Sequence, residues 1–352
     1  MLAFALVGCG RISRLHVKEL RAHPEARIVA LADAVPGAPE ALIKETFLEK
    51  VQVYSSTSEL LRREKGLDGV LVATPDHTHR AVVLEVLEAK LPVLCEKPLS
   101  VTADEAQPMA EAARKAGVIN AVHLSKRYTP AMQYMRRQIE SGKAGVVRHV
   151  RGRQAVQRIS NPDVKLEWRL RRETGGYGAL SDLGIHLIDN ALYALGFDET
   201  RVTEATGLEA VFIGERADPE TGRRGQVTAP DAAAFALRFS NGALAHFEVT
   251  RFGAGADEFS VDASRVTLRA DTVANTVEEY WHEVTDHQMA QSSFRAVDLK
   301  GEQSPGVFYR FVEAVRTARP MRPDFTDGLR LMRILDKIHE ACESGRRVAV
   351  EG

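Results

Sequence analysis

The N-terminal stretch constrains the fold of this chain more than any other feature does. An apolar segment, residues 3–7, runs directly into Gly8, Gly10 and Ser13. This order is typical of a buried strand that ends in a glycine turn and opens a helix. Gly8 allows the turn, Gly10 lets the backbone approach a phosphate without a Cβ in the way, and Ser13 is small enough for close packing. The pattern predicts a pyrophosphate site at a helix N-terminus, as in dinucleotide-binding folds.

An acidic residue after the second strand is the next feature that such a fold requires. Residues 27–32 form an apolar run that ends at Asp33, where a carboxylate accepts hydrogen bonds from ribose hydroxyls. The alternative is that Asp33 only caps a turn before Pro36. A carboxylate repels a 2′-phosphate, so Asp33 favours NAD over NADP, although Arg11 and Arg14 lie nearby in the sequence.

Apolar runs and helix-forming segments alternate through the first third of the chain. Short apolar runs at 69–73, 92–95 and 118–122 are separated by stretches such as 81–89, which has an apolar face at helical spacing. This alternation predicts a doubly wound parallel sheet in an α/β Rossmann domain over residues 1–123.

Beyond residue 123 the strands become longer and alternate polar with apolar residues. The clearest are 146–156, 202–212 and 235–250. They predict a large, mostly antiparallel open sheet in an α+β domain over residues 124–352. Asn241-Gly242 lies within the last run and predicts a hairpin with a primed turn.

The open sheet and a charged segment give two further expectations for this second domain. One face of such a sheet is covered by helices, and we expect the other to be buried in a homodimer or homotetramer, although arginine-rich strands could equally be solvated. The charged, glycine-containing segment 216–225 is interpreted as a mobile loop.

Length, charge and cysteine content exclude several classes of protein. The chain has 352 residues, enough for about two domains, and a net charge of −1 with no long basic run, which argues against nucleic acid or an anionic membrane as the main partner. No apolar run reaches membrane-spanning length, and the N-terminus has no basic region of a signal peptide. Three widely separated cysteines suit reduced thiols. We therefore expect a cytoplasmic protein.

Lys97 follows the apolar run 92–95 in the order Glu96-Lys97-Pro98. It thus lies at the carboxyl end of a predicted parallel strand, the edge where open α/β sheets bind ligands. An ammonium there can donate a hydrogen bond to a substrate hydroxyl and stabilise a developing alkoxide. Taken alone, a surface Glu–Lys pair before a loop proline explains the same residues.

Asp182 and His186 follow a glycine-rich segment, 175–178, and are four residues apart. On a helix this spacing puts both side chains on one face, so that a carboxylate and an imidazole can address neighbouring hydroxyls of one substrate. His186 is a candidate general base near neutral pH. The alternative is a buried structural histidine. Gly184 between them indicates either close approach of a ligand or tight helix packing.

With these motifs the chain resembles the glucose–fructose oxidoreductase, inositol dehydrogenase and rhizopine-catabolism family, called Gfo/Idh/MocA. The resemblance covers nearly the whole chain and is carried by residues 8–13, 74–79, 95–98, 168–169 and 175–189. It implies that Lys97, Asp182 and His186 form the catalytic set. The cofactor-binding residues that we expect are Gly8, Gly10, Arg11, Ile12, Asp33, Thr74, Pro75, His79, Glu96 and Lys97.

The expected substrate-binding residues are chosen because aromatic faces and guanidinium or amide donors suit polyol recognition. Beside the catalytic set they are Arg127, Tyr128, Gln154, Trp168, Arg169 and Tyr177. Apart from Tyr177, each could equally be a surface or packing residue. Relatives commonly have asparagine at Asp76 and glycine at Tyr177, so cofactor affinity and substrate size cannot be transferred. His77 and His79 have no third ligand nearby, and no metal is expected.

These observations predict an NAD-dependent dehydrogenase that oxidises a secondary hydroxyl of a sugar, sugar derivative or cyclitol, or reduces the corresponding ketone. One alternative is a redox-neutral glycosidase or epimerase that keeps NAD bound. A second is a dinucleotide- or sugar-sensing regulator without catalysis. A sensor would not need Lys97, Asp182 and His186 together, which makes it the least favoured of the three.

Overall fold

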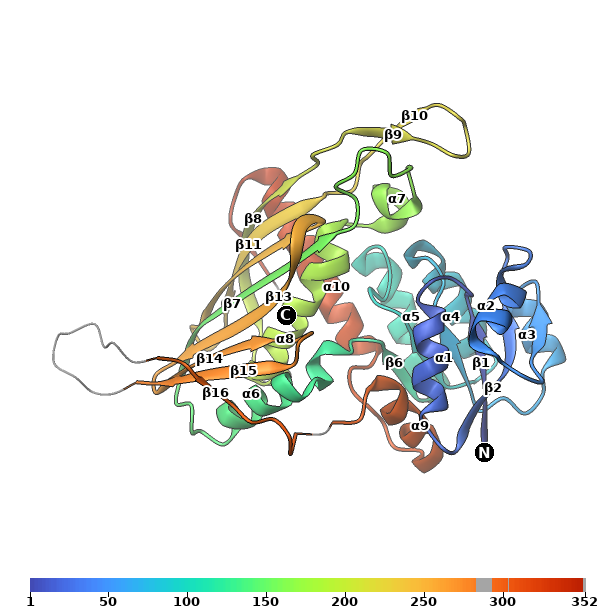
Figure 1. The fold of residues 1–352 in the computed structure, drawn as a ribbon, viewed down its shortest axis with the longest axis horizontal. Coiled ribbons are helices and arrows are strands. Elements are labelled where there is room, and N and C mark those ends of the chain that lie inside the picture. Colours follow the sequence, from blue (N-terminus) through green and yellow to red (C-terminus); the bar gives the residue numbers. More distant parts are fainter. Residues whose placement is uncertain (283–292, 303, 351–352) are drawn as a thin grey trace. The chain divides into compact units, whose positions relative to one another are not determined.

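The computed structural model describes residues 1–282, 293–302 and 304–350, which form two compact units (Figure 1). The first unit contains Met1–Leu124, Glu173–Gly176 and Pro305–Met332, and the second contains Ser125–Arg172, Tyr177–Ser304 and the chain from Arg333 on. These units differ from the predicted domains, because residues 305–332 join the first. The reason is helix α9 (Val307–Thr317), whose apolar face packs on that unit, with the Phe311 ring 5.9 Å from the ring of Phe4.

The first unit is built on a six-stranded parallel sheet in the order β3-β2-β1-β4-β5-β6. The strands are β1 (Leu2–Val7), β2 (Ala26–Ala32), β3 (Gln52–Tyr54), β4 (Gly69–Val72), β5 (Val93–Cys95) and β6 (Asn120–Val122). The connecting helices are α1 (Ser13–Arg21), α2 (Ala38–Thr46), α3 (Thr57–Arg63), α4 (His79–Glu88) and α5 (Ala103–Ala116). The doubly wound prediction is confirmed. The strand order reverses between β1 and β4, which is where such sheets bind ligands.

The second unit is built on a nine-stranded sheet in the order β16-β15-β14-β13-β7-β12-β11-β8-β17. Its strands are β7 (Val147–Gln157), β8 (Val202–Ala210), β11 (Ala232–Phe239), β12 (Leu244–Thr250), β13 (Phe252–Ala263), β14 (Val266–Asp271), β15 (Thr276–Trp281), β16 (Arg295–Ala296) and β17 (Val348–Ala349). All neighbouring pairs are antiparallel except β7 and β12, which run parallel. The predicted, mostly antiparallel sheet is confirmed.

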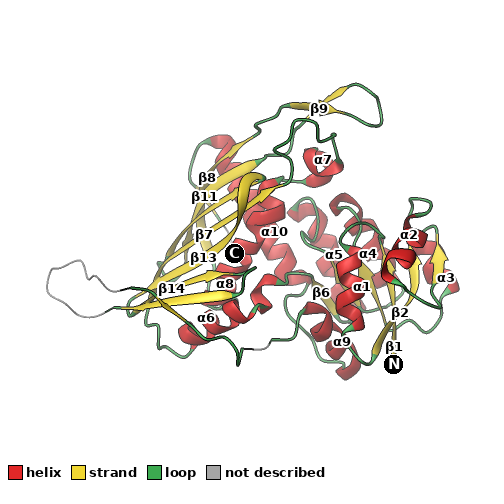
Figure 2. Ribbon diagram, viewed as in Figure 1, coloured by secondary structure: helices red, strands yellow, loops and turns green. Residues whose placement is uncertain are grey.

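Helices line one face of this sheet (Figure 2). They include α6 (Pro130–Glu140) and α8 (Ile185–Leu195), and a π-helical turn, Leu180–Gly184, precedes α8. Helix α10 (Phe325–Ser344) is divided between the two units, and the short α7 (Arg172–Gly175) lies at another unit boundary. Within the described ranges, no helix combines the length and apolar character that crossing a membrane requires.

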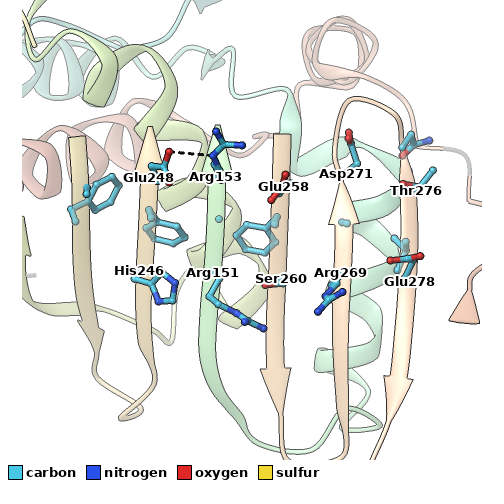
Figure 3. Close-up of a pocket in the computed structure, with 18 of the residues that line it drawn as sticks. Arg151, Arg153, His246, Glu248, Glu258, Ser260, Arg269, Asp271, Thr276 and Glu278 are labelled. Atoms are coloured by element: carbon cyan, nitrogen blue, oxygen red, sulfur yellow. Dashed lines mark hydrogen bonds and ion pairs between the residues drawn. The ribbon is translucent and has the colours of Figure 1, made fainter. Parts of the chain in front are cut away.

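The sheet of the second unit has one apolar and one mixed face. On β12, Phe247 is 2% exposed and faces the helices, whereas its neighbours His246 and Glu248 lie on the other face. That open face forms a hollow of about 1670 Å³ lined by charged side chains of both signs, including the ion pair of Glu248 with Arg153 at 3.2 Å (Figure 3). We call it the open face. It is exposed in the single chain.

The predicted hairpin is present, but the predicted turn type is wrong. Strands β11 and β12 pair with Arg238 opposite Leu244. The Gly242 N–H donates to the Phe239 carbonyl at 2.9 Å, and of the two loop residues Asn241 and Gly242 only the glycine has a positive φ, 84°. A primed turn of type I′ would need a positive φ at both, so the connection is a three-residue loop that ends in a left-handed glycine.

The segment interpreted as a mobile loop, 216–225, is also different in the structure. It belongs to an antiparallel ribbon of β9 (Glu215–Ala217) and β10 (Arg224–Gln226). Arg216 is fully buried, and its guanidinium donates to the carbonyls of Ile159, Asn161 and Val164. A charged residue therefore anchors the ribbon, because backbone carbonyls accept hydrogen bonds from both of its terminal nitrogens.

Candidate active site

The glycine turn after β1 is held by the carboxylate of Asp33. The Cys9 N–H donates to Asp33 Oδ2 at 2.6 Å, and the Val35 N–H donates to Oδ1 at 2.8 Å. The bond from Cys9 connects the end of β2 to the glycine turn. The bond from Val35 caps the turn after Asp33, which was the alternative interpretation of this residue. Burial, with a smaller contribution from Asp33, raises the pKa of the Cys9 thiol to about 12, so this thiol is inert at neutral pH.

The two glycines of the turn have different surroundings. Gly8 has φ 93°, and a Cβ there would lie 2.6 Å from the carbonyl carbon and oxygen of Ala73. A Cβ on Gly10 would meet no atom of the described residues within 4 Å. Gly10 and the side chain of Ile12, which is 39% exposed, thus border open space just before α1 begins at Ser13. This is the space that a pyrophosphate at a helix N-terminus needs.

The loops after β4 and β5 are joined by the buried His79. Its Nε2 lies 2.9 Å from the Thr74 carbonyl and its Nδ1 lies 3.0 Å from the Pro98 carbonyl. Burial lowers the pKa of this imidazole, so it is neutral at pH 7. The neutral ring has one N–H, so it donates to one of these two carbonyls and lies close to the other, and His79 thereby links the two loops. Its expected role in cofactor binding stays a prediction. Thr74 Oγ1 is buried without a hydrogen-bond partner among the described residues, which suits a ligand hydroxyl.

The backbone of Lys97 is fixed by its neighbour Glu96. The Lys97 N–H donates to Glu96 Oε2 at 3.0 Å, and the Lys97–Pro98 peptide bond is cis. Glu96 is buried, and its Oε1 lies 2.7 Å from His16 Nε2 and 3.0 Å from His123 Nδ1. The half-buried Lys97 side chain therefore projects from a strand end whose backbone is held by a buried carboxylate.

The three buried residues His16, Glu96 and His123 form an ion-pair cluster. Burial opposes ionisation of Glu96, but the charge and hydrogen bonds of the two histidines outweigh it and hold the pKa of Glu96 well below its usual range. Burial likewise acts against the charged form of His123, but Glu96 outweighs it and raises the pKa of His123. The three ligand atoms lie within 4.8 Å of one another, close enough for a metal ion. We interpret them as an ion pair, because Glu96 Oε1 already lies at hydrogen-bond distance from both imidazoles.

In the second unit, Asp182 lies in the π-helical turn and His186 in the first turn of α8. The Asp182 side chain is 24% exposed, and His186 is 8% exposed. Gly184 between them is explained by packing, because a Cβ there would lie 2.9 Å from Leu180 and 3.5 Å from the Phe235 ring. The hollow of the open face is not this site, since Phe235 faces the helices on the opposite side of the sheet.

Arg251, which the sequence did not single out, lies beside Asp182. Its Nη2 is 3.4 Å from Asp182 Oδ2, and its Nη1 donates to the Arg169 carbonyl at 3.1 Å. Its side chain is only 2% exposed. A lone arginine directly after the predicted strand run 235–250 carries no motif, so only the fold could show this contact.

Some of the expected substrate-binding residues lie near this group and others are engaged elsewhere. Gln154 is buried, and in the amide orientation that satisfies both ends it donates to the Leu183 carbonyl at 3.0 Å and accepts from Lys126 Nζ at 2.7 Å. Arg169 stacks its guanidinium 4.0 Å from the ring centroid of Trp168. Gln154 thus contacts the Leu180–Gly184 turn directly, and Arg169 is joined to Asp182 through Arg251.

Three other expected residues have different surroundings. Arg127 is buried, ion-paired with Asp189, and 4.8 Å from the Phe197 ring, which are the contacts of a packing residue. Tyr177 donates its hydroxyl to Asp336 at 2.8 Å and stacks on His339 at 4.6 Å, so its bulk is directed onto α10. Tyr128 is half-buried at the end of a 3₁₀ turn, Lys126–Tyr128.

Comparison with known proteins agrees with this geometry. Residues 2–124 match the profile of an oxidoreductase family with an NAD-binding Rossmann fold, and residues 132–269 match the GFO/IDH/MocA C-terminal domain. The chain belongs to the Gfo/Idh/MocA family. This member is accordingly an oxidoreductase with NAD as its cofactor.

Similar proteins of the Gfo/Idh/MocA family include dehydrogenases of sugars and cyclitols. A levoglucosan dehydrogenase of Pseudarthrobacter phenanthrenivorans is 30% identical over 53% of this chain and 50% of its own length, so the chain matches about half of that relative. A myo-inositol 2-dehydrogenase of Thermotoga maritima is 29% identical over 78% of this chain and 77% of its own. A solved levoglucosan dehydrogenase in complex with NADH and L-sorbose has a TM-score of 0.89 at 24% identity, covering 100% and 99% of the two chains, which shows the shared fold.

Proposed function

We propose that the protein is an NAD(H)-dependent dehydrogenase that oxidises a secondary hydroxyl of a sugar, sugar derivative or cyclitol, or reduces the corresponding ketone. The observation that carries the proposal is the position of Asp182 and His186 on consecutive helical turns, with a buried arginine beside Asp182. Relatives named as levoglucosan and inositol dehydrogenases support the substrate class.

The cofactor fits the loops of the first unit. Gly10 leaves open space before α1, Thr74 Oγ1 is a buried polar atom without a described partner, and Asp33 is held at the end of β2. We propose that the NAD site is formed by the residues expected from the sequence, which are Gly8, Gly10, Arg11, Ile12, Asp33, Thr74, Pro75, His79, Glu96 and Lys97. The nicotinamide, when bound, supplies the hydride acceptor. The carboxylate of Asp33 favours NAD over NADP.

We assign three roles to this chain's own residues in the oxidative direction. His186 takes the proton of the reacting hydroxyl, Lys97 donates a hydrogen bond that stabilises the alkoxide, and Asp182 accepts a hydrogen bond from substrate and orients the base. Tyr128, Gln154, Trp168 and Arg169 are proposed to line the substrate site. The buried contacts of Arg127 and the α10 contacts of Tyr177 do not support that role for them.

Replacement of Lys97 tests this assignment. We expect Lys97→Ala to lower kcat by about 10²–10⁴-fold, because it removes a group that acts in the transition state, and to leave the Kd for NAD nearly unchanged. Lys115→Ala, at an exposed position of α5, is the matched control and should behave as wild type. An unchanged kcat in Lys97→Ala, measured with saturating substrate and NAD, would remove Lys97 from the mechanism.

The open face of the second unit is proposed to bind a second copy of this chain, giving a homodimer or homotetramer. Its strands present Arg151, Arg153 and Arg269 among Glu248 and Glu258 (Figure 3). Because positive and negative side chains alternate across one surface, two copies related by a two-fold axis can pair opposite charges. Leu208, which is 72% exposed, also borders this face.

A further inference from the structure

Arg251 connects the element that carries Asp182 to two other segments of the second unit. It lies between β12 and β13, and its backbone N–H donates to the Asp231 carbonyl at 2.9 Å. Its guanidinium reaches Asp182 Oδ2 at 3.4 Å and the Arg169 carbonyl at 3.1 Å. One side chain thus contacts the Asp182 turn and the Trp168–Leu170 turn, while its own backbone is fixed at a strand end.

Burial makes this contact asymmetric. The Arg251 side chain is 2% exposed, whereas that of Asp182 is 24% exposed. The cation therefore approaches the carboxylate from the protein interior, while part of the Asp182 side chain is exposed. A guanidinium at that distance favours the ionised carboxylate, which accepts hydrogen bonds and does not donate them.

We propose that Arg251 is a positioning residue for Asp182. It holds the carboxylate ionised and oriented, so that Asp182 acts on substrate and on His186 as a hydrogen-bond acceptor. Through the Arg169 carbonyl it also fixes the Trp168–Leu170 turn relative to Asp182. This inference rests on the proposed dehydrogenase activity, in which Asp182 orients the substrate.

A double-mutant cycle tests the proposal. The variants are Arg251→Met, Asp182→Asn and the double substitution, assayed for NADH formation with the sugar or cyclitol that wild type oxidises fastest. In the wild-type background we expect Arg251→Met to lower kcat at least tenfold and to leave the Kd for NAD unchanged. In the Asp182→Asn background we expect the same substitution to lower kcat less than threefold. Arg251→Lys, which keeps the charge, should recover most of the lost kcat.

Arg216→Met is the matched control. Arg216 is as deeply buried as Arg251 but donates to carbonyls far from Asp182 in the sequence. It should lower the midpoint of unfolding while leaving kcat per folded molecule unchanged, both alone and combined with Asp182→Asn. The proposal is overturned if Arg251→Met and Asp182→Asn multiply in kcat, or if Arg251→Met has wild-type kcat per folded molecule.

If the dehydrogenase proposal is wrong, wild type itself forms no NADH. The contact between Arg251 and Asp182 is then tested by chemical unfolding at pH 7 of wild type, the two single variants and the double variant. Asp182→Asn should then destabilise wild type more than it destabilises Arg251→Met, because only wild type has the cation that the carboxylate pairs with. Equal destabilisation in both backgrounds would contradict the contact itself.

Discussion

Gly8→Ala and Gly10→Ala separate the structural glycine of the turn from the ligand-binding one. At position 8 a Cβ would lie 2.6 Å from Ala73 carbonyl atoms and 2.7 Å from the Thr74 nitrogen, all of them backbone atoms of the loop that follows β4. The φ of 93° adds a second penalty for any L residue. Position 10 has neither problem within the described part of the chain.

The expected cost at Gly8 follows from these two terms. A positive φ costs a residue with a Cβ about 1–2 kcal/mol. Relief of the overlap with backbone that cannot turn away costs about 1–3 kcal/mol, as for overpacked cores. Gly8→Ala should therefore lower the free energy of unfolding by about 2–5 kcal/mol, a large part of the roughly 5–15 kcal/mol of a typical domain.

Urea unfolding and calorimetric titration with NAD measure the two effects. We expect Gly8→Ala to lower the unfolding midpoint, and Gly10→Ala to keep the wild-type midpoint while raising the Kd for NAD at least tenfold, because its methyl group enters the space proposed for the pyrophosphate. A Gly8→Ala protein of wild-type stability would refute the steric argument. A Gly10→Ala protein with wild-type NAD affinity would refute the placement of the pyrophosphate.

Three further substitutions test other parts of the account. Asp33→Ser should raise kcat/KM for NADP relative to NAD about tenfold or more by removing the charge that repels a 2′-phosphate, and an unchanged ratio would contradict that role. His123→Gln should destabilise the protein by about 3 kcal/mol at pH 6, because one partner of a buried ion pair is lost. Glu96 raises the pKa of His123, so the ion pair stabilises the fold fully below the ordinary pKa range of histidine. This stabilisation is lost as pH rises through the raised pKa of His123. The difference in unfolding free energy between wild type and variant should therefore shrink by pH 9. A difference that is the same at both pH values would contradict the pair. Leu208→Glu should convert the oligomer to monomers in light scattering without loss of helix content by circular dichroism, and an unchanged mass would exclude the open face as the interface.

The parallel sheet could be predicted from sequence because its buried strands are continuous apolar runs between glycine, proline and helix formers. β1, β2 and β4 begin and end within one residue of the expected runs. The hairpin was also located by Asn241-Gly242, but the dihedral angles of the loop depend on the register of β11 and β12, which the dipeptide does not determine.

Residues whose role depends on distant partners could not be predicted. Arg216 lies in a charged segment that predicts a loop. The three carbonyls that accept its hydrogen bonds belong to residues 159–164, and only the fold brings them beside it. Arg251 has no motif, and its contact with Asp182 spans 69 positions. Tyr177 lies in the glycine-rich segment before Asp182, yet its hydroxyl donates to Asp336 on α10, about 160 residues later.

The most direct test of the proposed function is the absorbance of NADH after purified protein and NAD are mixed with a panel of sugars, sugar acids and inositols. The same panel is run with His186→Ala, whose fold is checked by its unfolding midpoint. We expect a substrate-dependent rise in absorbance that disappears in the variant. NAD binding without a signal for any compound would contradict it, and would favour a redox-neutral enzyme or a sensor.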